Sequence, residues 1–108
     1  MGQLHFNAQS YAFDDRTLAH VKAAITIRLR RQENFFLSWT KPADQGGGRI
    51  SLWMSPANPV AFTFGEGRAP ALNATWIRVM ESVSHSRLGM IVVTEEESQA
   101  YAAKHFGA

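Results

Sequence analysis

The chain has 108 residues, no cysteine and a formal net charge of +2. Its composition, 45% hydrophobic and 19% charged, excludes a disordered chain, and the lack of cysteine excludes a disulfide framework and a thiolate metal site. No apolar run is long enough to span a bilayer, and the first residues do not have the pattern of a leader. We therefore expect one folded domain in the cytoplasm.

The charge is unevenly spread along the chain. Residues 95–108 hold three glutamates against one lysine, a net charge of −2, which leaves +4 for residues 1–94. The stretch 16–32 is the most basic, with five cationic residues and no acidic one: Arg16, Lys22, Arg28, Arg30 and Arg31. Local positive potential of this kind favours an anionic partner.

The N-terminal segment predicts a short β-hairpin. Apolar residues alternate in LHF (4–6) and YAF (11–13), and the polar stretch NAQS separates the two runs. A helix is predicted next, because Asp14 or Asp15 can cap it and apolar residues follow at helical spacing. The members of that apolar stripe are Leu18, Val21, Ile25 and Leu29, and the helix is expected to end near residues 33–34.

Three strands are predicted to follow as a meander, at residues 35–40, 49–54 and 60–64. Their alternate residues share one face and should form the core side of a sheet. That core face comprises Phe35, Leu37, Trp39, Ile50, Leu52, Met54, Val60, Phe62 and Phe64. The prolines in the stretch 55–59 indicate a turn between the second and third of these strands.

A second helix is predicted from Asn73, with Trp76, Ile77, Met80 and Val83 as its buried stripe, and a last strand at 90–94. The order is β-β-α-β-β-β-α-β. This predicts an α+β fold, a single domain over residues 1–94 with a mainly antiparallel sheet and both helices on one face. Residues 95–108 are expected to form an acidic tail, either helical or disordered.

The opposite face of the predicted sheet carries two large aromatic residues, Phe36 and Trp53, among small polar ones. A solvated sheet face does not need such side chains. They are suited to stacking on nucleotide bases while Arg49 and Lys41 contact phosphate. The alternative is that they are buried against a second copy of the chain or against the tail.

The outer side of the first helix is predicted to be basic. Helical spacing gathers Arg16, His20, Ile27, Arg30 and Arg31 there. Phosphate contact is one interpretation, and a solvated helix whose arginines complement the helix dipole is the other. An exposed Ile27 would also suit the interface of a homodimer.

Catalytic and metal-binding patterns are incomplete. Ser84, His85 and Ser86 are adjacent but lack the elbow that presents a nucleophilic serine, and the histidines include no i, i+4 pair. The glycines of QGGGRISLW (45–53) lie between two predicted strands, whereas a phosphate-binding loop needs a helix after its glycines. We expect these glycines to form a hairpin tip, and we expect no catalytic residue, metal or cofactor.

Five stretches, MGQLHF, YAFDDRTLAHVK, LRRQENFFLSW, QGGGRISLW and PALNATWI, resemble a family of small uncharacterised actinobacterial and phage proteins of about this length. The resemblance covers roughly residues 1–94. Members are often labelled ATP-dependent DNA ligases, an activity that forms a lysyl-adenylate on a KxDG motif. None of Lys22, Lys41 or Lys104 begins that motif, and the resemblance therefore implies only a small free-standing domain.

Together these observations predict a non-enzymatic binding module for DNA or RNA. The expected contact residues are Arg16, Arg28, Arg30, Arg31, Lys41, Arg49, Trp53 and Phe36. The alternative is a homodimer or other protein-interaction module that uses Phe36, Trp53 and Ile27 as apolar anchors. No membrane partner is expected.

Overall fold

The computed structural model describes residues 1–83 and 89–106, and the Ser84, His85 and Ser86 stretch lies outside the described residues. The chain begins with the predicted hairpin, in which β1 (Gly2–Phe6) pairs antiparallel with β2 (Gln9–Phe13). Asn7 turns the chain with a φ of 55°, in the left-handed region that asparagine tolerates better than most residues.

The first helix, α1 (Asp15–Arg30), begins where its cap was predicted. The Asp14 carboxylate accepts a hydrogen bond of 3.0 Å from the Thr17 backbone N–H, which satisfies one of the free donors of the first turn. The predicted apolar stripe is buried or half-buried in the core. The helix ends a few residues earlier than expected, because Gln32 turns into the left-handed region with a φ of 61°.

The three following strands do not form one meander. β3 (Phe35–Thr40) and β4 (Arg49–Met54) form the predicted antiparallel pair, but β5 (Val60–Thr63) leaves β4 and pairs with β1. The prediction of a single sheet is therefore wrong. The structure has two three-stranded sheets, ordered β2-β1-β5 and β4-β3-β6. The pairing of β5 with β1 places the Phe62 side chain opposite Leu4, an apolar cross-strand pair.

The loop between β3 and β4 confirms the hairpin interpretation of the glycine stretch. A short 3-10 turn, η1 (Ala43–Gln45), is followed by Gly46, Gly47 and Gly48, whose φ values are 99°, 66° and 83°. Only glycine adopts such a run without strain. The Lys41 N–H then donates to the Gly48 carbonyl at 2.8 Å and closes the loop.

The second helix, α2 (Ala74–Val83), is capped by Asn73 as predicted, since the Asn73 side-chain oxygen accepts from Thr75 N–H at 3.0 Å and from Trp76 N–H at 3.3 Å. The last strand, β6 (Met90–Ile91), is shorter than predicted and pairs parallel with β3. It joins the sheet after a helical crossover, the usual route to a parallel neighbour.

A third helix, α3 (Glu95–His105), forms in the segment that was predicted to be an acidic tail, either helical or disordered. Thr94 and Glu97 form a capping box, in which the Thr94 hydroxyl accepts from Glu97 N–H at 3.1 Å and the Glu97 carboxylate accepts from Thr94 N–H at 2.8 Å. The helix packs against α2. The chain therefore has three helices in its described part, one more than the predicted order.

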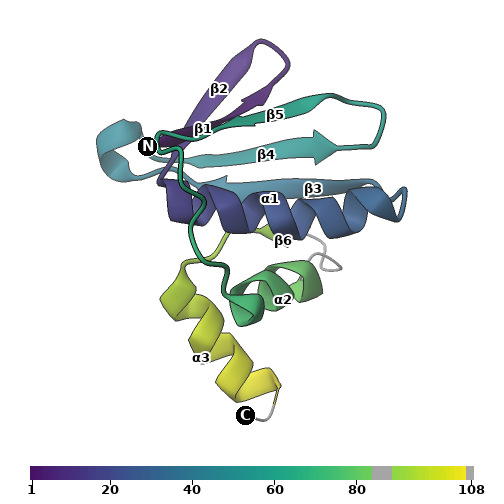
Figure 1. The fold of residues 1–108 in the computed structure, drawn as a ribbon, viewed down its shortest axis with the longest axis vertical. Helices are drawn as coiled ribbons and strands as arrows, with labels where there is room; N and C mark the ends of the chain where they lie inside the picture. Colours follow the sequence, from purple (N-terminus) through teal and green to yellow (C-terminus); the bar gives the residue numbers. More distant parts are fainter. Residues whose placement is uncertain (84–88, 107–108) are drawn as a thin grey trace.

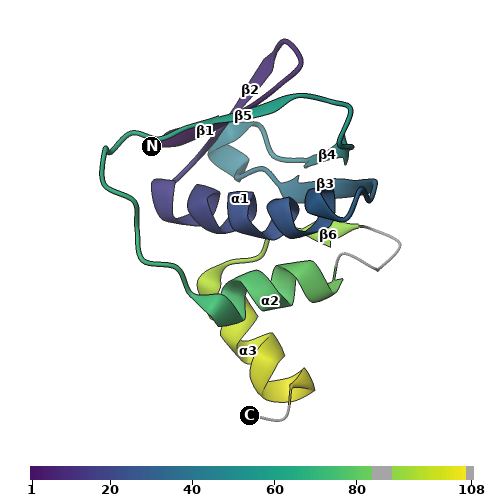
Figure 2. The same cartoon turned by 45° about the vertical axis from the view of Figure 1, so that its right-hand side comes forward.

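The core lies between α1 and the two sheets (Figure 1). α1 runs alongside β3, α2 lies beside α1, and α3 projects away from the sheets with the C-terminus at the far end (Figure 2). Trp39 of β3 connects the sheets, because its ring contacts Tyr11 and Phe13 of β2 edge-on, with centroid distances of 5.3 and 5.0 Å. Side-chain packing thus joins sheets that share no strand pair.

Candidate functional site

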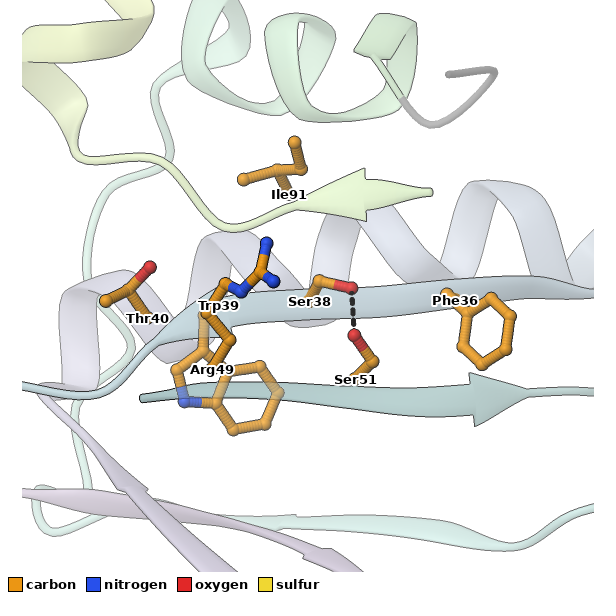
Figure 3. A pocket seen from close by; sticks show the side chains of 7 residues that line it. All are labelled: Phe36, Ser38, Trp39, Thr40, Arg49, Ser51 and Ile91. Atoms are coloured by element: carbon orange, nitrogen blue, oxygen red, sulfur yellow. Dashed lines mark hydrogen bonds between the residues drawn. The ribbon is translucent and has the colours of Figure 1, made fainter. Parts of the chain in front are cut away.

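The sheet of β4, β3 and β6 has one covered and one open face. Phe35, Leu37 and Trp39 point into the core and are at most 8% exposed. The residues between them point the other way, and the strand register pairs them across the sheet as Phe36 with Trp53, Ser38 with Ser51, and Thr40 with Arg49. We call this surface the open face (Figure 3).

Two aromatic side chains stand at one end of the open face. Phe36 is 44% exposed and Trp53 is 45% exposed. Their ring centroids are 5.0 Å apart, and the planes meet edge-on at 69°. The Trp53 ring and the Phe36 ring therefore pack against each other, and each still exposes apolar surface to water.

The middle of the open face is polar and neutral. The hydroxyl oxygens of Ser38 and Ser51 are 2.8 Å apart and hydrogen-bonded (Figure 3). Ile91 of β6 flanks them, and Arg49 lies at the other end. Together they line a shallow cavity of about 700 Å³ whose lining includes one cation and no acidic side chain.

The arginines of α1 that were predicted to contact nucleic acid lie in different environments. The Arg28 side chain is only 5% exposed, with its Nε 3.2 Å from Glu33 Oε1 and its Nη1 3.6 Å from Glu81 Oε1. A buried guanidinium requires such partners. Arg28 therefore lies in the interior, without the surface position that phosphate contact needs. Arg31 is exposed but also pairs with Glu81, at 3.3 Å.

His20 was expected on the outer side of α1 and is instead completely buried. Its Nδ1 lies 2.7 Å from the Arg16 carbonyl, and its Nε2 accepts from the Asn73 N–H at 2.7 Å, so the ring is held as the Nδ1–H tautomer. It also stacks on Trp76 at 4.2 Å. The expectation failed because α2 covers this side of α1.

Arg16 was expected to face solvent on the outer side of α1, but its guanidinium forms hydrogen bonds to two other segments of the chain. It donates through Nε and Nη2 to Glu95, at 3.1 and 2.7 Å, and through Nη1 to the Ala71 carbonyl at 2.8 Å. The Asn73 amide donates to Glu95 at 2.8 Å. The hydrogen bonds from Arg16 and Asn73 lower the pKa of Glu95 from 4.5 to about 2.

The remaining predicted residues divide between two surfaces. Lys41 follows β3 directly, beside the Arg49 end of the open face, and is half-buried. Arg30 is exposed and Ile27 half-buried on the outer side of α1. The structure therefore brings Phe36, Trp53 and Arg49 together and separates them from the basic helix.

Two residues that were predicted only as helix caps also form contacts between distant segments. Asn73 was predicted as a cap but not as a partner of His20 and Glu95. The Asp15 carboxylate, predicted as a cap, accepts from Gly65 N–H at 3.0 Å and Glu66 N–H at 2.9 Å, which lowers its pKa. No sequence pattern links groups so distant along the chain.

Within residues 1–83 and 89–106, no group of three or more histidine, cysteine, aspartate or glutamate side chains is placed to hold a metal ion. No helix in the same ranges is long and apolar enough to cross a membrane.

The chain matches a family model described as a domain of unknown function (DUF7882) over residues 1–95. The chain belongs to this family. The match covers both sheets, α1 and α2, and ends at Glu95, the first residue of α3 and the partner of Arg16. No curated protein and no solved structure matches the chain significantly.

Proposed function

We propose that this chain is a non-enzymatic module that binds single-stranded nucleic acid on the open face. The exposed pair of Phe36 and Trp53 supports this proposal most strongly. Aromatic side chains on an otherwise polar sheet are the feature that single-strand binding sheets share. A duplex keeps its bases stacked internally and cannot offer them to Trp53.

Each part of the open face has a distinct role in this proposal. A base stacks on the exposed part of the Trp53 ring, an interaction worth about 1–3 kcal/mol per base. Arg49 is four residues away on the same strand, about 13 Å along β4, and contacts a neighbouring phosphate. The hydroxyls of Ser38 and Ser51 lie between them and can donate to or accept from base edges.

The proposed site is smaller than the one expected from the sequence. Phosphate contacts come from Arg49, with Lys41 beside it, because Arg28 is buried and Arg16 holds Glu95. With few cations, the electrostatic part of the affinity is modest and stacking carries more of the binding. We therefore expect weak salt dependence for a nucleic-acid binder.

Fluorescence polarisation with dye-labelled single-stranded and duplex DNA and RNA tests the proposal. We expect single strands to bind and Trp53→Ala to weaken binding by about tenfold or more. Arg49→Ala should weaken binding and reduce the salt slope by roughly 0.7, the value for one phosphate contact on a single strand. Arg30→Ala, an exposed arginine away from the open face, is the matched control. No binding of any probe at low salt would overturn the proposal.

A homodimer through the open face is the second candidate, because the same exposed aromatic pair would suit an isologous contact. Half-buried Ile27 lies on another surface and would not contribute to this interface. Light scattering distinguishes the two: a dimer that Trp53→Ala converts to a monomer, without nucleic-acid binding, favours the second candidate.

A further inference from the structure

A second concave surface lies on the far side of α1 from the sheets. Leu18, Val21 and Ile25 point into the core, whereas Ala19 and Ala23 point outward and form its floor. The cavity that it encloses has a volume of about 660 Å³, and we call this cavity the α1 basin. It shares no lining residue with the open face.

The walls of the α1 basin carry large apolar side chains. They include Phe64, which follows β5, Leu72, which precedes α2, and Ile77, in the first turn of α2. Leu72 is 58% exposed. Among the described residues, the other exposed large hydrophobic side chains are Met1 and the aromatic pair of the open face. Leu72 therefore adds exposed apolar surface to that of Phe64 and Ile77 in the same concavity, and apolar surface gathered in one place and rimmed by polar residues marks interaction sites.

The rim of the α1 basin is mainly basic. Lys22, Arg30 and Arg68 are exposed, and none of them forms an ion pair with any residue that the structure describes. Glu66 is the acidic lining residue. Lys22 and Arg30 are eight residues apart on α1, about 12 Å along the axis, and Arg68 belongs to the opposite wall. The positive charges are therefore spread around the rim.

We propose that the α1 basin binds an acidic amphipathic helix of a partner protein. The helix would place its apolar side chains against Leu72, Ile77 and Phe64, and its flanking carboxylates against the rim cations. Spread cations suit a ligand with several anionic groups along its length better than a ligand with a single anionic head. The floor alanines Ala19 and Ala23, one helical turn apart, let a second helix approach α1 closely.

Binding of three dye-labelled synthetic peptides of about 15 residues, a length near the minimum for helix formation, tests the proposal. One peptide has a leucine stripe flanked by glutamates, the second has the same stripe flanked by lysines, and the third keeps the glutamates but scrambles the stripe. We expect only the first to bind. Leu72→Ser and Arg30→Glu should each weaken its binding by about tenfold or more, a change of about 1.4 kcal/mol.

The matched control is Arg49→Glu, which reverses an exposed charge on the open face and should leave peptide binding unchanged. Circular dichroism checks that each variant is folded. Leu72 and Arg30 are both exposed, so the two substitutions test the proposal independently. Oligonucleotide binding is measured on the same variants. A loss of peptide binding can then be distinguished from a loss of nucleic-acid binding.

Three results would overturn the proposal: equal binding of all three peptides, no binding of the first peptide, or binding that both variants leave unchanged. A dimer of the chain that Leu72→Ser dissociates would also overturn it, because the α1 basin would then belong to a second copy.

Discussion

The Arg16 guanidinium holds both carboxylate oxygens of Glu95, with Nε 3.1 Å from Oε1 and Nη2 2.7 Å from Oε2. Arg16 is in the first turn of α1, and Glu95 begins α3. The same carboxylate accepts from Asn73, the cap of α2. The N-terminal ends of all three helices therefore meet at one side chain.

Acid should weaken the attachment of α3. The pKa of Glu95 is lowered from 4.5 to about 2 by its hydrogen bonds in the fold. A lowered folded-state pKa gives stability that is fully present above about pH 4.5 and is lost as pH falls toward 2. Amide hydrogen exchange should show protection of α3 falling in that window. Glu95→Gln should remove most of this dependence, and Glu96→Gln, on an exposed neighbour, should keep it.

Replacing His20 with phenylalanine should destabilise the protein by about 1–3 kcal/mol, the cost of leaving a buried polar group without a partner. The variant keeps an aromatic ring against Trp76 but cannot accept from Asn73 N–H or bond to the Arg16 carbonyl. Urea unfolding measures the change. His105→Phe, at an exposed position that stacks on Tyr101, is the control and should be near neutral.

Gly89→Ala should destabilise the protein by about 2 kcal/mol or more, since an L-residue pays 1–2 kcal/mol for the left-handed conformation alone. Gly89 has a φ of 78°, and an added Cβ would meet the backbone carbonyl of Phe36 and lie 2.9 Å from its Cβ. The β6 pairing should suffer first. Gly67→Ala, which has open space and an ordinary φ, should change the free energy of unfolding little, and equal effects of the two substitutions would contradict this account.

Two neighbouring phenylalanines should respond differently to truncation. Phe35 is 4% exposed and Phe36 is 44% exposed. Phe35→Ala should cost about 3–5 kcal/mol, the usual range for a buried aromatic residue, whereas Phe36→Ala should cost much less. Chemical denaturation of both variants checks the difference, and a large loss for Phe36→Ala would place that ring in a buried interface.

Local patterns predicted most of the elements and the two exposed aromatics. Alternation on β3 and β4 was enough to separate Phe35 from Phe36, and the caps at Asp14 and Asn73 were readable from residue type. The pairing of β5 could not be predicted from residue type. A turn rich in proline fixes where the chain bends, but it does not determine which strand β5 then pairs with. The choice depends on apolar contacts with β1, more than fifty residues away.

The phosphate contact expected of Arg28 was misjudged for a related reason. Arg28 lies three residues after Ile25 and seven after Val21, so helical spacing already placed it beside the buried stripe. Its burial is possible because Glu33 and Glu81 approach it, and Glu81 could not be assigned from sequence. Thr94 and Glu97 did carry a readable capping-box signal for α3.

The three tryptophans lie in three different environments. Trp39 is at the junction of the two sheets, Trp76 lies among the helices with its Nε1–H donating to the Val93 carbonyl at 2.9 Å, and Trp53 is 45% exposed. An indole in water emits at longer wavelength than a buried one. Variants that keep one tryptophan each would therefore act as built-in optical reporters, so that sheet separation, helix release and ligand arrival could be followed as three separate signals.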